Sequence, residues 1–314
     1  MFEVEKKSMR EVYGDCLIEM FSDYPNLVVL DADLSGSTMT KGFSKKYPER
    51  FFNVGVAEQN MMGMAAGLAA VGMLPTVNSF STFLSMRCVE QFRQSVAYTN
   101  LKVVVGGHYG GMSDSHDGPT HHCTEDLGII RSIPNTTLIA PSDGEEVRGA
   151  MKVAFDCDGP VYLRMCRNPV LAVSWKNDGF QLGKGYEVVP GTDVTVIGVG
   201  IMVGRAVQAS QELEKENISC RVLAMPSLKP IDREIIAKAA AETGAIVTAE
   251  EHNMYGGLGS AVAEVIVEEA PVPMERVAIQ DTFAESGTYE GLLEKYGLGV
   301  SHVVAAAKKV LKRK

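Results

Sequence analysis

Short apolar runs alternate with amphipathic segments along the first half of the chain. The first amphipathic segment, 9–21, repeats apolar residues at helical spacing behind a capping box of Ser8 and Glu11. Further helices are predicted after Glu58, over 83–98, from Glu125, and from a second capping box of Ser142 and Glu145. The predicted strands are 27–30, 51–56, 76–80, 102–105, 137–140 and 161–163. Strands that alternate with helices indicate a parallel sheet with both faces covered.

The alternation stops over residues 167–192, which predict a linker across the surface, and it restarts at Asp193. In the second half we expect strands at 194–197, 221–225, 245–250 and 276–280, and helices at 201–216, 232–242, 258–269, 288–296 and after Ser301. The predicted fold class is therefore α/β, with two consecutive parallel-sheet domains. They cover residues 1–166 and 193–314, and the second has a common domain size.

The stretch from Phe51 to Thr82 combines a strand, one acid and a helix of small and apolar residues. A helix without a polar face is expected to be buried, and Gly63 and Gly67 allow another backbone to approach it. Glu58 begins this helix. An acid there either complements the helix dipole or, if it is buried, faces a ligand. Burial without a hydrogen-bond partner is costly, so the predicted burial favours the ligand.

Composition excludes several classes of function. A net charge of −9 without a basic stripe argues against nucleic acid as a partner. No uncharged apolar run has the length of a membrane span, and no signal peptide is visible at the N-terminus, so we expect a cytoplasmic protein that does not enter a membrane. The six cysteines form no CxxC motif, and reduced thiols fit that location.

Residues 106–124 form a long glycine-rich loop after a predicted parallel strand, and they contain four of the six histidines. Ligands bind at this end of the strands in open α/β sheets. Metal binding through His116, His121, His122 and Cys123 is one interpretation, but their spacing matches no known ligand frame, and we predict no metal ligand in this chain. Histidines that cap turns are a second interpretation, and a substrate loop is the third.

Four motifs carry a resemblance to a known family: GVAEQNMMGMAAGLAA, STFL, DGPTHH and RSIPN. In this order they resemble the pyrimidine-binding half of thiamine-diphosphate enzymes of the transketolase group, and the similarity is greatest to the C-terminal subunit of a split transketolase. The resemblance implies that Glu58 hydrogen-bonds the aminopyrimidine ring and activates the cofactor, that Phe83 packs on this ring, and that Met86 and Asp33 belong to the same cofactor site.

The resemblance also implies a site for a phosphorylated or otherwise anionic sugar. Asp117 and His121 would contact sugar hydroxyls and serve catalysis with Glu58, and His108 would lie near the phosphate end. The phosphate contacts are expected from Arg10, Ser37 and Arg167, whereas Arg164 is the position used by deoxyxylulose phosphate synthases. Arginine suits these anions because its planar fork binds two oxygens. The segment before Asp117 is one residue longer than in the family, and His116 replaces an acid.

The family's GlyAspGly motif, which holds the diphosphate through a metal ion, does not occur in this sequence. The resemblance therefore implies an N-terminal transketolase-type partner that carries the diphosphate and Mg²⁺ or Ca²⁺, in an α2β2 assembly. The implied reaction is transfer of a two-carbon ketol unit from a ketose phosphate to an aldose. A deoxyxylulose phosphate synthase-like reaction, the beta chain of a 2-oxo acid dehydrogenase and a non-catalytic binding or regulatory protein remain alternatives.

Overall fold

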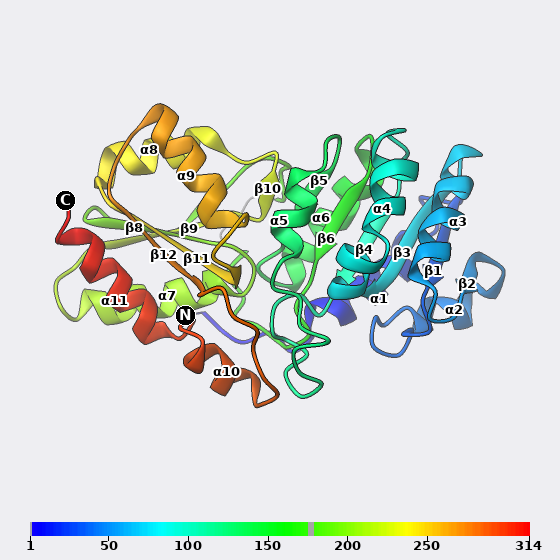
Figure 1. The fold of residues 1–314 in the computed structure, drawn as a ribbon, viewed down its shortest axis with the longest axis horizontal. Helices are drawn as coiled ribbons and strands as arrows, with labels where there is room; N and C mark the ends of the chain where they lie inside the picture. Colours follow the sequence, from blue (N-terminus) through cyan, green and yellow to red (C-terminus); the bar gives the residue numbers. More distant parts are fainter. Residues whose placement is uncertain (1, 175–178) are drawn as a thin grey trace.

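The computed structural model describes residues 2–174 and 179–314 and contains two α/β domains side by side (Figure 1). The first sheet has seven strands in the order β10-β5-β6-β4-β3-β1-β2. The second has five in the order β12-β11-β8-β9-β7. All neighbours are parallel except β10 with β5 and β7 with β9. Two parallel-sheet α/β domains were the fold class predicted from the sequence, and this prediction is confirmed.

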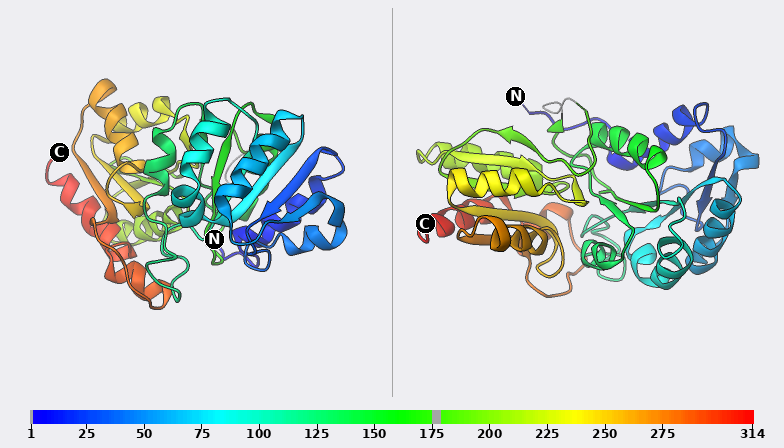
Figure 2. Two further views of the ribbon diagram at one scale, coloured as in Figure 1. Left: turned by 45° about the vertical axis from the view of Figure 1, so that its right-hand side comes forward. Right: turned by 90° about the horizontal axis from the view of Figure 1, so that it is seen from above.

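The first half follows the expected alternation. Its helices and strands are α1 (Met9–Met20), β1 (Leu27–Asp31), α2 (Lys41–Lys46), β2 (Phe51–Asn53), α3 (Glu58–Ala70), β3 (Leu74–Phe80), α4 (Val89–Gln91), β4 (Val104–His108), α5 (Asp126–Ser132), β5 (Thr137–Ile139), α6 (Gly144–Asp156) and β6 (Val161–Arg164). Buried strands such as β1, β3 and β4 occupy the sheet centre, and the helices cover both faces (Figure 2).

The second half is built the same way. Its elements are β7 (Tyr186–Val189), β8 (Val194–Gly198), α7 (Met202–Glu214), β9 (Cys220–Ala224), β10 (Ser227–Lys229), α8 (Arg233–Thr243), β11 (Ile246–Asn253), α9 (Leu258–Glu269), β12 (Met274–Ile279), α10 (Tyr289–Lys295) and α11 (Val300–Leu311). The capping box of Ser8 and Glu11 at α1 is present, as predicted.

Several boundaries differ from the sequence prediction. The strand expected over 51–56 ends at Asn53, because Gly55 turns the chain with a φ of +72°. The helix expected over 83–98 contains two π-helical turns, Phe83–Arg87 and Phe92–Ala97, around α4. The cap of α6 is Asp143, which accepts a hydrogen bond from the Glu146 N–H, instead of Ser142.

The predicted linker was wrong in one respect: residues 186–189 form strand β7, which pairs with β9. Residues 175–178 of this segment lie outside the described part of the chain. Strand β10 was not predicted at all. It belongs to the second half in sequence but pairs with β5 of the first sheet, and one hydrophobic cluster runs through this junction from Leu138 to Met225 and Leu228.

Helix α3 is buried on one face only, which corrects the expectation of a fully buried helix. Met61, Met62 and Ala65 pack against the sheet. Gln59 and Asn60 give the opposite face polar character, and the stripe of Gly63 and Gly67 has open space in front of it. An added Cβ at either glycine would meet no atom within 4 Å. The close backbone approach predicted for these glycines therefore does not occur within the described residues of this chain.

Candidate functional site

The carboxyl ends of β1, β3, β4 and β6 gather the predicted site residues at one edge of the first sheet. The segment after β1 carries Asp33 and Ser37, and the segment after β3 carries Phe83 and Met86. We call residues 109–124, which follow β4, the substrate loop, after the role that the family resemblance implies for them, and Arg167 follows β6. Ligand sites of open α/β sheets lie at such an edge.

Glu58 occupies the first turn of α3 and is only 3% exposed. Its carboxylate accepts bonds from Arg87 Nη1, at 3.2 Å to Oε1 and 3.3 Å to Oε2, and from Ser79 Oγ at 3.4 Å. Arg87 also lies over the ring of Phe83, with its guanidinium carbon 3.9 Å from the ring centroid. A planar cation therefore sits between a buried carboxylate and an aromatic face.

Sequence reasoning missed Arg87. One signal was available, because Arg87 follows Phe83 by four residues, and residues at that spacing share a helical face. Phe83 itself is half-buried, and it contacts Phe80 in a stacked arrangement at 5.7 Å and His121 edge-on at 5.4 Å. Met86 is exposed on the same turn. The structure therefore brings the predicted cofactor residues Glu58, Phe83 and Met86 together.

Asp33 is exposed, has a φ of +63° and accepts a hydrogen bond from Asn53 at 2.8 Å. The nearby carboxylate of Asp31 is buried, and it organises this segment by accepting bonds from Leu34 N, Thr38 Oγ1 and Thr40 Oγ1. Burial raises the pKa of Asp31. Asp31 was not predicted as a site residue, although it ends a strand at the ligand edge.

The anion cluster consists of Arg10, Ser37, Tyr109 and Arg167. Arg10 Nη1 donates to the Ser37 carbonyl at 3.0 Å and to the Tyr109 hydroxyl at 2.6 Å. Both arginines lie over the Tyr109 ring, each 5.3 Å from its centroid. A cleft of about 470 Å³ opens here, lined by Arg10, His116 and Arg167 among others. The predicted anion-binding arginines thus converge, with Tyr109 as the unpredicted residue between them.

His121 and Asp117 lie on the accessible part of the substrate loop, and His121 reaches Phe83. His121 Nδ1 is 3.0 Å from Thr120 Oγ1. Asp114, on the same loop, contacts Arg167 at 3.3 Å. Burial, and then the neighbouring charge of Asp117, raise the pKa of Asp114 to about 6. The loop therefore links the anion cluster to the aromatic face near Glu58.

Two predicted substrate residues are placed differently from the expectation. His108 is fully buried edge-on against Tyr13 at 5.0 Å, and neither ring nitrogen has a hydrogen-bond partner among the described residues. Burial, and then the charge of Arg10, lower the pKa of His108 to about 3, so the ring is neutral. A sugar contact by His108 is not supported by this geometry, because its ring offers no accessible surface.

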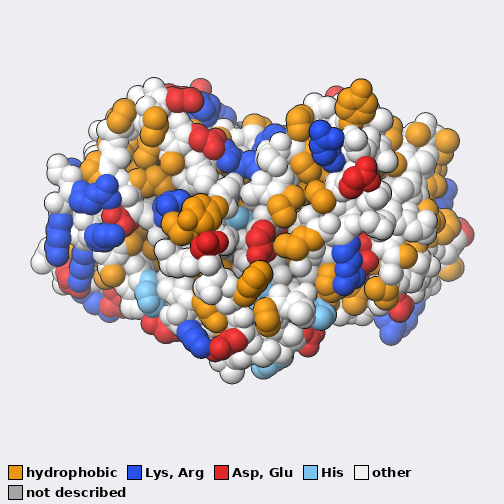
Figure 3. Space-filling model, viewed as in Figure 1, with side chains coloured by type: hydrophobic (Ala, Val, Ile, Leu, Met, Phe, Trp, Pro, Cys, Tyr) orange, Lys and Arg blue, Asp and Glu red, His pale blue; other side chains and the backbone are white. Residues whose placement is uncertain are grey.

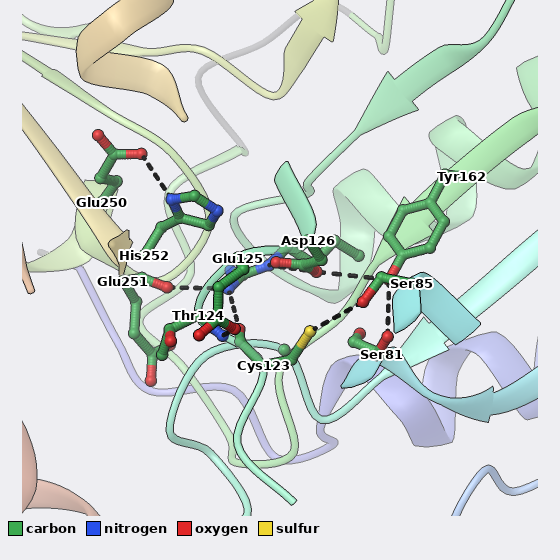
Figure 4. Close-up of polar contacts among 12 residues, drawn as sticks. Ser81, Ser85, Cys123, Thr124, Glu125, Asp126, Tyr162, Glu250, Glu251 and His252 are labelled. Carbon is green, nitrogen blue, oxygen red and sulfur yellow. Dashed lines mark hydrogen bonds and ion pairs between the residues drawn. The ribbon is translucent and has the colours of Figure 1, made fainter. Parts of the chain in front are cut away.

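Arg164 is likewise withdrawn from the ligand edge. Its Nε donates to both carboxylate oxygens of Asp126, at 2.9 and 3.1 Å, and its Nη2 donates to the carbonyls of Cys123 and Glu251. Asp126 also accepts from Tyr162, and the Cys123 thiol faces Ser85 (Figure 4). The substrate contact considered for Arg164 is therefore not supported, because buried protein groups already occupy its guanidinium.

No group of His, Cys, Asp and Glu among residues 2–174 and 179–314 is arranged to hold a metal ion. None of the helices in the described part of the chain has the length and apolar character that crossing a bilayer requires.

Charged and hydrophobic side chains are mixed over the face shown in Figure 3, which is notched between the two halves.

Comparisons with known proteins match both halves of the chain. Residues 5–171 match the family "Transketolase, pyrimidine binding domain", and residues 183–303 match "Transketolase, C-terminal domain". The 6-deoxy-6-sulfo-D-fructose transketolase subunit SqwH of Clostridium sp. (strain MSTE9) is 42% identical, with 100% of this chain and 98% of that protein covered. An apulose-4-phosphate transketolase subunit of Phocaeicola vulgatus is 36% identical, with 97% of each covered.

A solved structure described as a split gene transketolase, inactive β4 tetramer, superposes with a TM-score of 0.89 at 45% identity. The superposition covers 98% of this chain and 99% of the other. Both halves of the chain thus match one family in sequence and in fold, and the buried acid beside a half-exposed aromatic ring lies in the half that matches the pyrimidine-binding domain. The chain belongs to the transketolase family, and it is similar to the C-terminal-type subunits of split transketolases.

Proposed function

We propose that this chain is one subunit of a thiamine-diphosphate-dependent transketolase that transfers a two-carbon ketol unit from an anionic ketose to an aldose. The observation that carries the proposal is the buried Glu58 carboxylate beside the half-exposed face of Phe83. The loop after β4 connects this place to the anion cluster, because its His121 contacts Phe83 and its Asp114 contacts Arg167. One edge of one sheet thus offers places for a flat heteroaromatic ring and for a charged sugar.

The residues around Glu58 fit the pyrimidine end of the cofactor. A buried carboxylate binds a protonated ring nitrogen, and an aromatic face stacks on the ring. When bound, thiamine diphosphate supplies the carbanion stabilisation that breaks and forms the carbon–carbon bond. Glu58 would hold a proton at the ring nitrogen, Phe83 would stack on the ring, and Met86 and Asp33 would flank it.

The diphosphate end has no counterpart among the described residues of this chain, which contain no oxygen-ligand cluster for Mg²⁺ or Ca²⁺. We assign that end, with its metal ion, to an N-terminal-type partner subunit, in an α2β2 assembly located in the cytoplasm. The outward face of α3, with Gln59, Asn60 and open space at Gly63 and Gly67, supports a partner beside Glu58.

The anion cluster supports the substrate class. Arg10 and Arg167 would bind the charged group, Ser37 would contribute beside them, and Asp117 and His121 would orient sugar hydroxyls. The relatives from Clostridium and Phocaeicola are named for a sulfo-sugar and a sugar phosphate, and both substrates carry an anionic group. The deoxyxylulose phosphate synthase alternative is less favoured, because Arg164 is buried and its Nε and Nη2 already donate to Asp126, Cys123 and Glu251.

The test is to mix the purified chain with an N-terminal-type transketolase subunit and to follow ketol transfer between sugar phosphates. We expect turnover only in the mixture, and a 1:1 complex of the two chains by mass photometry. The isolated chain should show neither turnover nor tight, Mg²⁺-dependent binding of thiamine diphosphate by calorimetry. Micromolar binding by the chain alone would contradict the shared site, and a complex without turnover would favour a regulatory protein.

A further inference from the structure

The substrate loop is fastened to the second half of the chain, although it belongs to the first. Met112 N donates to Glu251 Oε1 at 2.7 Å, Gly287 N donates to the Ser115 carbonyl at 2.9 Å, and Asn253 N donates to the Thr124 carbonyl at 2.7 Å. Glu251 and Asn253 come from β11, and Gly287 precedes α10. The segment that carries Asp117 and His121 is therefore held at its start, middle and end.

Glu251 makes the side-chain contact in this set, and its carboxylate is almost completely buried. Its Oε2 accepts a hydrogen bond from the Tyr289 hydroxyl at 2.9 Å, so both carboxylate oxygens are used. The loop approaches so closely that a Cβ at Gly111 would lie 2.2 Å from the carboxyl carbon. Gly111 also has a φ of +68°, and only glycine combines that conformation with so close an approach.

The two residues that close the substrate loop, Gly111 and Cys123, form its neck, and they connect the Glu251 contact to the rest of the loop. Gly111 and Cys123 exchange two backbone hydrogen bonds of 2.8 Å, which close the loop into a ring of residues 111–123. Arg164 then binds the carbonyls of Cys123 and Glu251, at 3.2 and 2.8 Å. A displacement of Glu251 would therefore move both strands of the neck and, with them, the part of the loop that reaches Arg167 and Phe83.

We propose that Glu251 is a positioning residue: from the second half of the chain it holds the substrate loop in register with the anion cluster and with Phe83. Its kinetic consequence rests on the proposed function, whereas its effect on loop order does not. Glu251 is buried and is not among the residues expected to contact substrate. It acts through Met112 N–H and the neck of the loop on Asp114, which binds Arg167, and on His121, which packs against Phe83.

The first test is hydrogen–deuterium exchange of the isolated chain, followed by mass spectrometry. Glu251→Ala removes the acceptor of the Tyr289 hydroxyl and that of the Met112 N–H. Loss of the Met112 bond should let the backbone amides of residues 111–123 exchange about 10- to 100-fold faster. Glu251→Gln keeps an acceptor of the same size and should restore most of the protection. Unchanged exchange in the Ala variant would overturn the proposal.

Glu250 provides a matched control. It is an adjacent buried glutamate that also accepts two hydrogen bonds, from Leu258 N and Gly259 N, and these lie at the start of α9 within its own half. In Figure 4 its carboxylate faces His252. Glu250→Ala should accelerate exchange at residues 258–262 and leave residues 111–123 unchanged. Acceleration of the loop by both variants would show general loosening and contradict a specific role of Glu251.

If Glu251→Ala does not fold, Gly111→Ala perturbs the same contact from the loop side and keeps every titratable group. It should accelerate exchange of residues 111–123 in the same way, and a protected loop in this variant would overturn the proposal.

The second test measures steady-state kinetics with the partner subunit. Glu251→Ala should raise the KM for the anionic ketose about tenfold and leave the thiamine diphosphate dependence unchanged, because the loop binds the sugar and Glu58 the cofactor. A lower kcat at unchanged KM would contradict a positioning role. If no mixture shows turnover, the proposed reaction fails, and the exchange measurement still decides the role of Glu251.

Discussion

The first half of the chain contains two arginine–carboxylate pairs of opposite character. In Arg164–Asp126 both side chains are buried, at 7% and 0% exposure, and Nε bonds both carboxylate oxygens. In Arg87–Glu58 the carboxylate is buried, but the arginine is 48% exposed and uses one nitrogen at 3.2 and 3.3 Å. The first pair is also bonded to two carbonyls, one from each half of the chain.

With the proposed function, this difference separates a part of the molecule that is complete within the chain from a part that would receive the cofactor. A buried ion pair is strongly destabilised when one partner is removed, because the other charge remains in a low-dielectric interior. A half-exposed pair is screened by solvent and contributes little. Arg164 therefore stabilises the position of the substrate loop. Arg87 lies between Glu58 and Phe83, and its contacts there stabilise the fold only weakly.

We call Arg87–Glu58 the open pair, because its arginine is half-exposed, and Arg164–Asp126 the closed pair, because both of its side chains are buried. The largest effect is expected from a change to the carboxylate of the open pair. Glu58→Gln keeps the size and hydrogen-bonding capacity of the side chain and loses its charge. If Glu58 activates the cofactor, turnover of the reconstituted enzyme should fall by about 10²–10⁴-fold, as is typical for general acid–base groups. Circular dichroism and complex formation should remain unchanged. The direct measurement is hydrogen–deuterium exchange at thiazolium C2 of bound cofactor, and a wild-type rate in the Gln variant would refute the assignment.

Breaking the closed pair should affect folding instead. Arg164→Met leaves Asp126 buried without its ion-pair partner, and we expect the free energy of unfolding to fall by about 3–5 kcal/mol. Urea denaturation measures this change. The double variant Arg164→Met/Asp126→Leu removes both charges and should recover part of the loss. A stable single variant would show that Arg164 does not hold the two halves together.

The anion cluster should respond in substrate affinity. Arg10→Ala and Arg167→Ala each remove a hydrogen-bonding charge, and each such bond contributes roughly 1.5–3 kcal/mol, so the KM for the anionic ketose should rise about 10- to 100-fold. The dependence on thiamine diphosphate should change much less. Arg205→Ala, which removes an ion pair with Glu290 on the second half, is the control and should leave KM unchanged. Unchanged KM in both cluster variants would remove these residues from the site.

Glu251, whose carbonyl accepts a hydrogen bond from Arg164, should make the free energy of unfolding depend on pH. Burial raises the pKa of Glu251 to about 7, above its ordinary value of 4.5. Between these values the folded chain binds more protons at this group than the unfolded chain, so its contribution to stability is present below pH 4.5 and is lost as pH rises toward 7. Relative to Glu251→Gln, the wild type should lose on the order of 1–3 kcal/mol of unfolding free energy between about pH 5 and pH 8. Parallel pH profiles of the two proteins would contradict the raised pKa.

The smallest effect is expected from the arginine of the open pair. Arg87→Met keeps an apolar cover on Phe83 and removes the bond to Glu58. We expect a change of about 0–1 kcal/mol in unfolding free energy, because the guanidinium is half-exposed. In the reconstituted enzyme the variant should bind thiamine diphosphate at least as fast as the wild type in stopped-flow fluorescence. A loss as large as that of Arg164→Met would show that the two pairs are equivalent.

The sequence by itself determined the α/β class and the alternation of elements in both halves, and it predicted which segments meet at the edge of the first sheet. It could do so because strand burial, helical period and the capping of α1 are local properties, and because parallel strands bring the segments that follow them to one edge. Glu58, Phe83, Arg10 and Arg167 were all identified in this way or through family motifs, and the structure places each of them at that edge.

Only the tertiary structure decided which polar residues are accessible at the edge of the first sheet and which are buried and bonded to other protein groups. His108 and Arg164 resemble site residues in sequence, but packing against Tyr13 and pairing with Asp126 bury them. Strand β10 leaves its own half to pair with β5, and Glu251 reaches across the same junction to the substrate loop. These contacts join residues that are far apart in the sequence. Local propensity and hydrophobic period do not specify such partners, because the partners depend on how the two sheets pack against each other.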